Sequence, residues 1–368
     1  MSKMFETTEI NGMKLANRFV RSATWEGMAA EDGACSPALA ELMAGLAKGK
    51  VGLIITSHAF VKKDGRAGPW QLGIYDDSLI QSLKQMTKAV HDEGGRIVVQ
   101  ISHAGVLAMP ELTGKTPMGP SQVEGFPKSP HKGMSVKEIK EVVDAFEQAA
   151  NRARESGFDR VQIHAAHGYL LSQFLSPAFN KRTDDYGGPV VNRTRALMEV
   201  LWKVRSAVGD DFPVLVKMNS EDFLDHGLTL ADSVEVGAML QENGIDAIEL
   251  SGGTLLSRKL SPSRMGIDSE EKEAYFREAA RSFKKELRVP LILVGGNRSL
   301  QVSEKLVEEK YADYISMARP FIREPDLIKR WESGDLRRAA CISDTKCFAP
   351  ARAGEGIYCV VEKKQKKA

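Results

Sequence analysis

Short runs of β-branched and other apolar residues recur along the chain at fairly regular intervals, and longer segments with helical spacing separate them. In the segments Ser135–Ser156 and Leu228–Asn243, for example, apolar residues recur three and four positions apart. Eight of the short runs are expected to be strands: Arg18–Ala23, Val51–Ser57, Arg96–Ser102, Arg160–Ala165, Pro213–Asn219, Ala247–Ser251, Leu291–Val294 and Tyr314–Ala318.

Capping residues lie where the intervening helices should begin and end. Ser135 is followed three residues later by Glu138, which is the pattern of a capping box. The other signals are Ser36 before Pro37, Thr229 at a helix start, and Gly157 and Gly244 at or just past helix ends.

Strands that alternate with helices predict right-handed βαβ units and a parallel sheet. Eight such units over most of the chain favour a TIM (β/α)8 barrel over a doubly wound sheet. No linker rich in Pro, Gly or Ser divides residues 1–335, which we therefore expect to form one α/β barrel domain, followed by a short cysteine-containing extension at 336–368. The segment Val106–Pro130 is expected to be a long loop that helps to shape the active site.

The composition narrows the class of protein. The chain has 368 residues, of which 42% are hydrophobic and 27% charged, and its net charge is +2. This balance favours a globular protein and gives no electrostatic reason to expect a nucleic acid or membrane partner. The sequence shows no apolar run long enough to span a bilayer and no signal-peptide core, so a cytoplasmic location is the default expectation. Four cysteines do not suggest a disulfide framework, and a homo-oligomer is compatible with the sequence.

Catalytic groups in a TIM barrel come from the C-terminal ends of the strands. Gly295 and Gly296 follow the seventh predicted strand, and Ala318 and Arg319 end the eighth. Loops at these two positions commonly bind phosphate in this fold, and an arginine can hold phosphate bidentately. The alternative is an ordinary glycine turn and an arginine paired with a surface acid.

The fourth strand ends in the segment HAAHGYL, which contains His164, His167 and Tyr169. Two imidazoles can donate hydrogen bonds to a carbonyl or carboxylate oxygen, and a phenol can donate a proton. A zinc site is the alternative, but no third ligand accompanies the two histidines. Two hydrogen-bonded structural histidines are the other alternative.

Lys217 lies late in the apolar fifth strand and is expected to point into the barrel mouth. There it could stabilise an anion, form a Schiff base with a carbonyl substrate, or pair with an acid inside the barrel. The sequence has neither a Rossmann fingerprint nor a P-loop.

Four segments resemble the old yellow enzyme (NADH:flavin oxidoreductase) family. They are NGMKLANRFVRSA, VVQISHAG, HAAHGYLLSQFLSPAFNKRTDDYGG with the following NRTR, and the pair LVGGNR and SMARPFIREPDL. The resemblance implies an FMN-dependent ene-reductase, in which FMN lies across the barrel mouth, is reduced by NADH or NADPH, and passes hydride to the C=C bond of an enone or enoate.

The resemblance also implies roles for individual residues. His164 and His167 would polarise the substrate carbonyl, and Tyr169 would protonate the α-carbon. Lys217 would lie near N1 and O2 of the flavin. The remaining cofactor-binding positions are Ala23 and Thr24 against the flavin, Gln100 at its pyrimidine edge, and Gly295, Gly296, Ala318 and Arg319 at the phosphate.

Three positions depart from the family pattern. Trp25 stands where relatives place a Thr or Cys that tunes the flavin, which argues against covalent flavin attachment. Lys217 replaces the usual arginine, keeping the charge but losing the planar fork. His58 stands where relatives often have alanine; its backbone would serve the cofactor, and its side chain would narrow the site.

The end of the chain resembles the iron–sulfur segment of the 2,4-dienoyl-CoA reductase branch. Cys341, Cys347 and Cys359 match three of that segment's four cysteines, and Asp344 stands at the other position. That branch also carries a second half that binds FAD and NADPH, whereas this chain stops at residue 368. We therefore expect a degenerate or structural segment without a metal, with an altered iron–sulfur cluster or a zinc ion as the alternatives.

Two other functions compete with the ene-reductase. One is an aldolase-type lyase that forms a Schiff base through Lys217. The other is a flavin-binding electron-transfer subunit whose partner supplies the missing FAD half.

Overall fold

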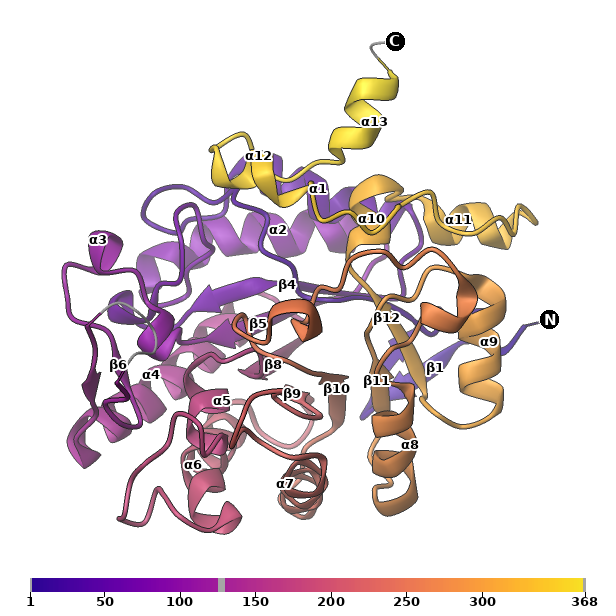
Figure 1. Ribbon diagram of the computed structural model, residues 1–368. Helices are drawn as coiled ribbons and strands as arrows, with labels where there is room; N and C mark the ends of the chain where they lie inside the picture. The colour runs from indigo at the N-terminus through magenta and orange to yellow at the C-terminus, as the bar shows by residue number, and fades with distance from the viewer. Residues whose placement is uncertain (1, 125–129, 367–368) are drawn as a thin grey trace.

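Eight parallel strands close into a barrel in the computed structural model, which describes residues 2–124 and 130–366 (Figure 1). Following the chain around the barrel, the hydrogen-bonded order is β3, β4, β5, β8, β9, β10, β11 and β12. The TIM barrel predicted from the sequence is thus confirmed, and β4 runs three residues further than expected. The strands are β3 (Phe19–Arg21), β4 (Leu53–Phe60), β5 (Ile97–Ser102), β8 (Arg160–Ala165), β9 (Val214–Asn219), β10 (Ala247–Ser251), β11 (Leu291–Leu293) and β12 (Tyr314–Met317).

Helices follow the strands and surround the barrel (Figure 1). The capping predictions are confirmed: Ser135 and Glu138 form a capping box at α4, and Ser36 and Thr229 cap α1 and α7. The main helices are α1 (Pro37–Lys48), α2 (Ile80–Asp92), α4 (Val136–Glu155), α6 (Val190–Val208), α7 (Leu230–Glu242), α8 (Arg277–Glu286) and α9 (Leu300–Glu308), with shorter ones at α5 (Leu170–Leu175), α10 (Arg319–Arg323) and α11 (Leu327–Glu332).

An N-terminal hairpin fills one end of the barrel. Strands β1 (Thr8–Ile10) and β2 (Met13–Leu15) pair antiparallel, and Ile10, Met13 and Leu15 are buried in one cluster with side chains from the barrel strands, including Leu53 and Ile292. Because this end is packed with apolar side chains, a ligand must enter at the opposite end, where the strands have their C-termini.

The loop after β5 contains short elements of its own: η4 (Gly105–Leu107), α3 (Pro110–Thr113), and the two-residue strands β6 (Met118–Gly119) and β7 (Lys132–Gly133), which pair with each other. Residues 125–129 of the expected loop Val106–Pro130 lie outside the described residues.

The C-terminal extension lies across the top of the barrel in the view of Figure 1 and contains α12 (Phe348–Arg352) and α13 (Val360–Gln365). Cys347, Ala351 and Ile357 are buried there, and Trp25 and Leu42 pack against them. The extension therefore contacts both α1 and the loop after β3. In the described part of the chain, no helix is both long and apolar enough to cross a membrane.

Candidate active site

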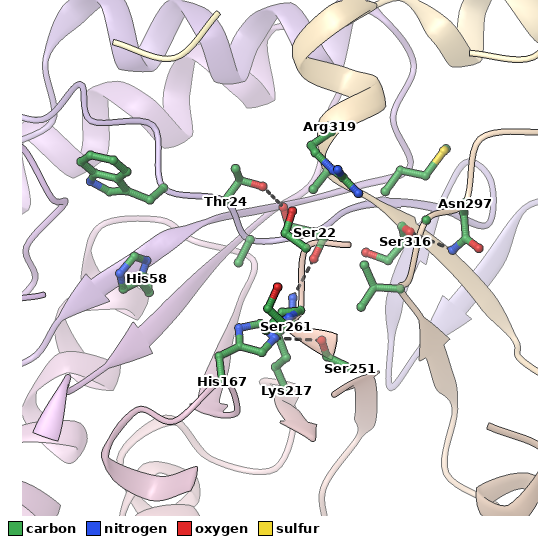
Figure 2. A pocket seen from close by; sticks show the side chains of 18 of the residues that line it. Ser22, Thr24, His58, His167, Lys217, Ser251, Ser261, Asn297, Ser316 and Arg319 are labelled. Atoms are coloured by element: carbon green, nitrogen blue, oxygen red, sulfur yellow. Dashed lines mark hydrogen bonds between the residues drawn. The ribbon is translucent and has the colours of Figure 1, made fainter. Parts of the chain in front are cut away.

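A cavity of about 340 Å³ opens at the C-terminal end of the barrel (Figure 2). Gly295, although it was expected to contribute, is not among the residues that line the cavity and instead lies against Tyr275 and Phe276. The structure brings the other twelve predicted positions together around this one cavity: Ala23, Thr24, Trp25, His58, Gln100, His164, His167, Tyr169, Lys217, Gly296, Ala318 and Arg319.

One side of the cavity is suited to an anion. Arg319 is buried; its Nη2 donates to the carbonyl oxygen of Arg264 at 2.8 Å, whereas its Nη1 has no hydrogen-bond partner in the described chain. Gly296 has a φ of +80°, and a Cβ atom there would lie 2.8 Å from the ring of Tyr275. A side chain at position 296 would therefore be strained and would clash with Tyr275, and the glycine lines the same cavity as Arg319.

The floor of the cavity holds a buried ion pair. Lys217 Nζ donates to Ser22 Oγ at 2.7 Å and to Glu249 Oε1 at 3.2 Å. Glu249, in the middle of β10, also accepts from Ser22, Gln162 and Ser316 at 2.7 to 2.9 Å. Burial opposes ionisation of Glu249, but Lys217 and these donors outweigh it and lower its pKa.

Lys217 is thus held as the charged partner of an acid inside the barrel. Burial lowers the pKa of Lys217, and Glu249 opposes that shift. A lysine fixed between a carboxylate and a hydroxyl can present positive charge to the cavity. The same pairing disfavours the free amine that a Schiff-base lyase needs.

Gln100 and Thr24 occupy neighbouring parts of the wall. Gln100 is buried, and its Nε2 donates to Gln162 Oε1 at 2.7 Å. The Thr24 hydroxyl donates to the carbonyl oxygen of Ser22 at 3.0 Å. Gln162 also donates to Glu249, so the Gln100 amide is oriented by the same buried network that holds Lys217.

His164, His167 and Tyr169 converge at the end of β8. The ring centroid of His164 lies 5.2 Å from that of His167 and 4.9 Å from that of Tyr169. His164 Nδ1 is buried and lacks a hydrogen-bond partner among the described residues, whereas His167 Nε2 lies 2.8 Å from Ser251 Oγ. One imidazole nitrogen is therefore left free to bond a ligand in the cavity.

The backbone of His167 adopts a left-handed conformation, with a φ of +64°. Its N–H donates to Asn219 Oδ1 at 3.1 Å, and the residue also forms an isolated bridge with Thr254. Such a conformation in a non-glycine residue persists only where neighbours hold it, so β9 and the loop after β10 together fix the imidazole in place.

Burial keeps the two histidines neutral and the tyrosine protonated. Desolvation, together with the positive charge of Lys217, lowers the pKa of both His164 and His167 well below the ordinary value. Desolvation raises the pKa of Tyr169 to about 12. Near neutral pH the site therefore offers neutral imidazoles as hydrogen-bond donors and a phenol that still carries its proton.

His58 adds a side chain to this group. Its Nε2 lies 3.2 Å from Tyr169 Oη, and its pKa is lowered to about 4 by burial and by the charge of Lys217. Figure 2 shows His58 on the opposite side of the pocket from Arg319 and Asn297. The cavity thus has an anion-binding side and a side with imidazoles and a phenol.

A second, outer space of about 700 Å³, called the vestibule below, adjoins the cavity and shares Trp25, His58 and Tyr169 with it. Trp25 packs against the C-terminal extension, and its Nε1 is buried and unpaired in the described structure. Leu255, Ser263 and Phe348 also line both spaces, and the remaining residues around the vestibule are Ala67, Gly68, Pro69, Met109, Thr345 and Arg352.

The cysteines of the extension face a separate cavity of only about 20 Å³. Cys341, Cys347 and Cys359 line it together with Asp344 and with Arg319. Burial raises the pKa of Cys347 to about 11 and also raises that of Cys341. Among the described residues, no group of three or more Cys, His, Asp or Glu side chains is arranged to hold a metal ion.

Several residues of the site escaped prediction. Glu249 is the most important of them, and its signal was a lone acid inside the apolar strand AIELS. Ser251, at the end of β10, is another. The rest come from loops and from the C-terminal extension, whose course the strand pattern does not reveal; they include Leu255, Ser263, Tyr275, Ser343 and Phe348.

Comparison with known proteins gives a consistent result. The model of the NADH:flavin oxidoreductase / NADH oxidase family matches residues 3–337. An NADH oxidase from Thermoanaerobacter brockii is 32% identical over 348 residues, which cover 92% of this chain and 52% of that protein. An NADPH dehydrogenase from Bacillus subtilis (strain 168) is 34% identical over 325 residues, covering 88% of this chain and 92% of the relative.

Among solved structures, a complex of 2-naphthoyl-CoA reductase with 2-naphthoyl-CoA superimposes with a TM-score of 0.90 at 27% identity. The match covers 98% of this chain and 56% of the reductase. The chain thus spans about half the length of the Thermoanaerobacter NADH oxidase and of the naphthoyl-CoA reductase.

Proposed function

Since the chain belongs to the NADH:flavin oxidoreductase / NADH oxidase family, we propose that it is an FMN-dependent oxidoreductase that uses NADH or NADPH to reduce the C=C bond of α,β-unsaturated carbonyl compounds. The observation that carries the proposal is the convergence of His164, His167 and Tyr169 on one side of a cavity whose other side presents the unpaired Nη1 of Arg319. A cytoplasmic location and an extension beginning at residue 336 are parts of the same proposal.

The residues present fit FMN. Arg319 Nη1 is a buried donor without a partner among the described residues, and Gly296 lines the same cavity. We assign the phosphate to Gly295, Gly296, Ala318 and Arg319, with Gly295 acting through the turn it makes. Ala23, Thr24, Trp25 and the backbone of His58 would lie along the ring system, Gln100 would bond its pyrimidine edge, and Lys217 would place positive charge beside it.

FMN, when bound, supplies a two-electron carrier that takes hydride from NAD(P)H and gives it to an activated alkene. The charge of Lys217 stabilises negative charge that develops on a reduced ligand in this cavity. Because Glu249, Ser22 and the surrounding amides fix Lys217 before any ligand binds, the enzyme pays little reorganisation free energy for this stabilisation.

The side chains at the end of β8 act on the substrate. His164 would donate from Nδ1 to the carbonyl oxygen, which withdraws electron density from the β-carbon. Ser251 donating to His167 Nε2 would leave the proton of that neutral ring on Nδ1, available to the same oxygen. Tyr169, whose high pKa keeps it protonated, would give its proton to the α-carbon.

The proposed substrate class includes enones, enoates and unsaturated thioesters. The similar structure of a 2-naphthoyl-CoA reductase holds a conjugated thioester, whose carbonyl can accept the same two hydrogen bonds. The vestibule supports this breadth because it gives substituents on the carbonyl compound about 700 Å³ of additional space.

An anaerobic absorption experiment tests the proposal. Purified protein, reconstituted with FMN if necessary, should be yellow; NADPH or NADH should bleach it, and 2-cyclohexen-1-one should restore the colour. Protein that binds no FMN would contradict the proposal.

The same preparation discriminates the two alternatives. Borohydride trapping of a carbonyl compound on Lys217 would instead support the lyase. Bound FMN that exchanges electrons quickly with a partner flavoprotein, but slowly with NAD(P)H, would support an electron-transfer subunit.

A further inference from the structure

We propose that His58 is a proton-relay residue, which carries protons from the vestibule to Tyr169 after each reduction of substrate. This inference rests on the proposed function. The contact that carries it is the 3.2 Å approach of His58 Nε2 to Tyr169 Oη, with the two ring centroids 5.1 Å apart. No other residue is paired with the Tyr169 hydroxyl within the described structure.

The backbone of β4 explains how a histidine reaches this position. The register of β4 against β5 shifts between Ile55 and His58: three steps along β4 correspond to two along β5, from Val98 to Gln100. An extra residue of this kind is a β-bulge, which re-aims the side chains that follow it. The His58 carbonyl oxygen then accepts a hydrogen bond from Gln71 Nε2 at 2.8 Å, which anchors the residue.

The location of His58 between two spaces suits a relay. His58 and Tyr169 line both the inner cavity and the vestibule. Among the described residues around the vestibule, His58 carries the one imidazole, whose two ring nitrogens can take up a proton on one side while giving one up on the other. A proton from water in the vestibule can therefore reach Tyr169 through the imidazole.

Every proton that the relay moves has a donor and an acceptor. Tyr169 breaks its O–H bond as the α-carbon of the substrate gains a C–H bond, which leaves a tyrosinate. His58 then transfers the proton from Nε2 to Oη, while Nδ1 takes a proton from water in the vestibule. Water in the vestibule then takes the proton from Nδ1 and returns one to Nε2, which restores the Nε2–H form, so the net change is one proton taken from solvent.

The surroundings keep His58 in the neutral form that this relay needs. The groups that face it are Lys217 from β9, His164 and His167 from the end of β8, and Tyr169 itself. None of them is a carboxylate, and burial together with the positive charge of Lys217 lowers the pKa of His58 to about 4. A neutral imidazole with its proton on Nε2 donates to Oη and leaves the Tyr169 O–H free to face the substrate.

The relay is tested in His58→Ala and His58→Gln by comparing steady-state turnover of NADPH and 2-cyclohexen-1-one with the first reoxidation of NADPH-reduced enzyme in a stopped-flow instrument. Steady-state turnover should be roughly 10- to 100-fold slower than wild type in both variants, whereas the first reoxidation, for which Tyr169 already carries its proton, should slow far less. Added imidazole should restore the rate of His58→Ala. It should not restore the rate of His58→Gln, because the amide fills the space, or that of a His58→Ala/Tyr169→Phe double variant.

Nitrogen-15 NMR of histidine-labelled protein gives a readout independent of turnover. The His58 resonance, identified by its loss in His58→Gln, should show the neutral Nε2–H form from pH 5 to 9. A protonated His58 ring near neutral pH would overturn the relay. A His58→Gln variant as fast as wild type would also overturn it, since a side chain that only forms a hydrogen bond to Tyr169 would then be enough for turnover. Wild-type enzyme that the enone cannot reoxidise would contradict the proposed function and, with it, the relay.

Discussion

The buried pair of Lys217 and Glu249 shows how one residue's role depends on another that the sequence did not single out. The Lys217 side chain is 3% exposed and the Glu249 side chain 0%, so neither charge can be solvated by water. Each is satisfied only by the other and by hydroxyl and amide groups of the barrel interior. Removing one partner leaves an uncompensated charge in a nonpolar interior.

Substitution of Glu249 by Gln should therefore lower the free energy of unfolding by about 3–5 kcal/mol, because Lys217 stays buried without its counter-ion. Urea denaturation followed by far-ultraviolet circular dichroism measures the change. The double variant Glu249→Gln/Lys217→Met should recover much of the loss. A single variant as stable as wild type would show that the pair is not a coupled unit.

At the level of secondary-structure elements, the C-terminal extension contributes to the mouth of the site through α12. Phe348 and Arg352, at the two ends of this helix, line the vestibule, whereas Ala351 is fully buried against the barrel. The part of the extension around α12 is anchored by the buried cluster of Cys347, Ala351 and Ile357. Its position, and therefore the shape of the vestibule, should depend on that small cluster.

Substitution of Ile357 by Asp should loosen the extension without unfolding the barrel, because a carboxylate in this cluster has no partner and would draw the segment towards water. Hydrogen exchange should increase in residues 345–360 and stay unchanged in the barrel strands. Ile357→Val is the matched control and should behave like wild type. Equal exchange in all three proteins would mean that Ile357 does not anchor the extension.

For the molecule as a whole, the fold could be predicted from the sequence, whereas only part of the site could be. All eight barrel strands were predicted, because strands covered on both faces read as apolar runs between capped helices. The strand ends then brought twelve candidate residues together. Local periodicity does not encode tertiary packing. Three features depend on that packing: the β4 bulge, the ion pair of Glu249 with Lys217, and the position of Phe348.

The cluster of neutral histidines also predicts how stability depends on pH. The folded protein lowers the pKa of His58 to about 4, and lowers those of His164 and His167, whereas unfolded histidine titrates near 6.5. Between these values the unfolded chain binds more protons, so stability is full above pH 6.5 and falls as the pH drops towards 4.

Thermal unfolding at pH 7 and pH 5 checks this dependence. The midpoint should fall at pH 5, and the fall should be smaller in His58→Gln, which removes one of the three groups. A midpoint that is the same at both pH values in wild type would contradict neutral burial of these histidines.

The division of the active site into a cofactor side and a substrate side is tested by Tyr169→Phe in two separate half-reactions. The variant keeps the ring but cannot donate a proton. Its reduction by NADPH, followed by flavin absorbance, should proceed within about 2-fold of wild type, whereas reoxidation by 2-cyclohexen-1-one should slow by roughly 100-fold or more. Equal slowing of both half-reactions, or of neither, would contradict the role of Tyr169 as the proton donor to the substrate.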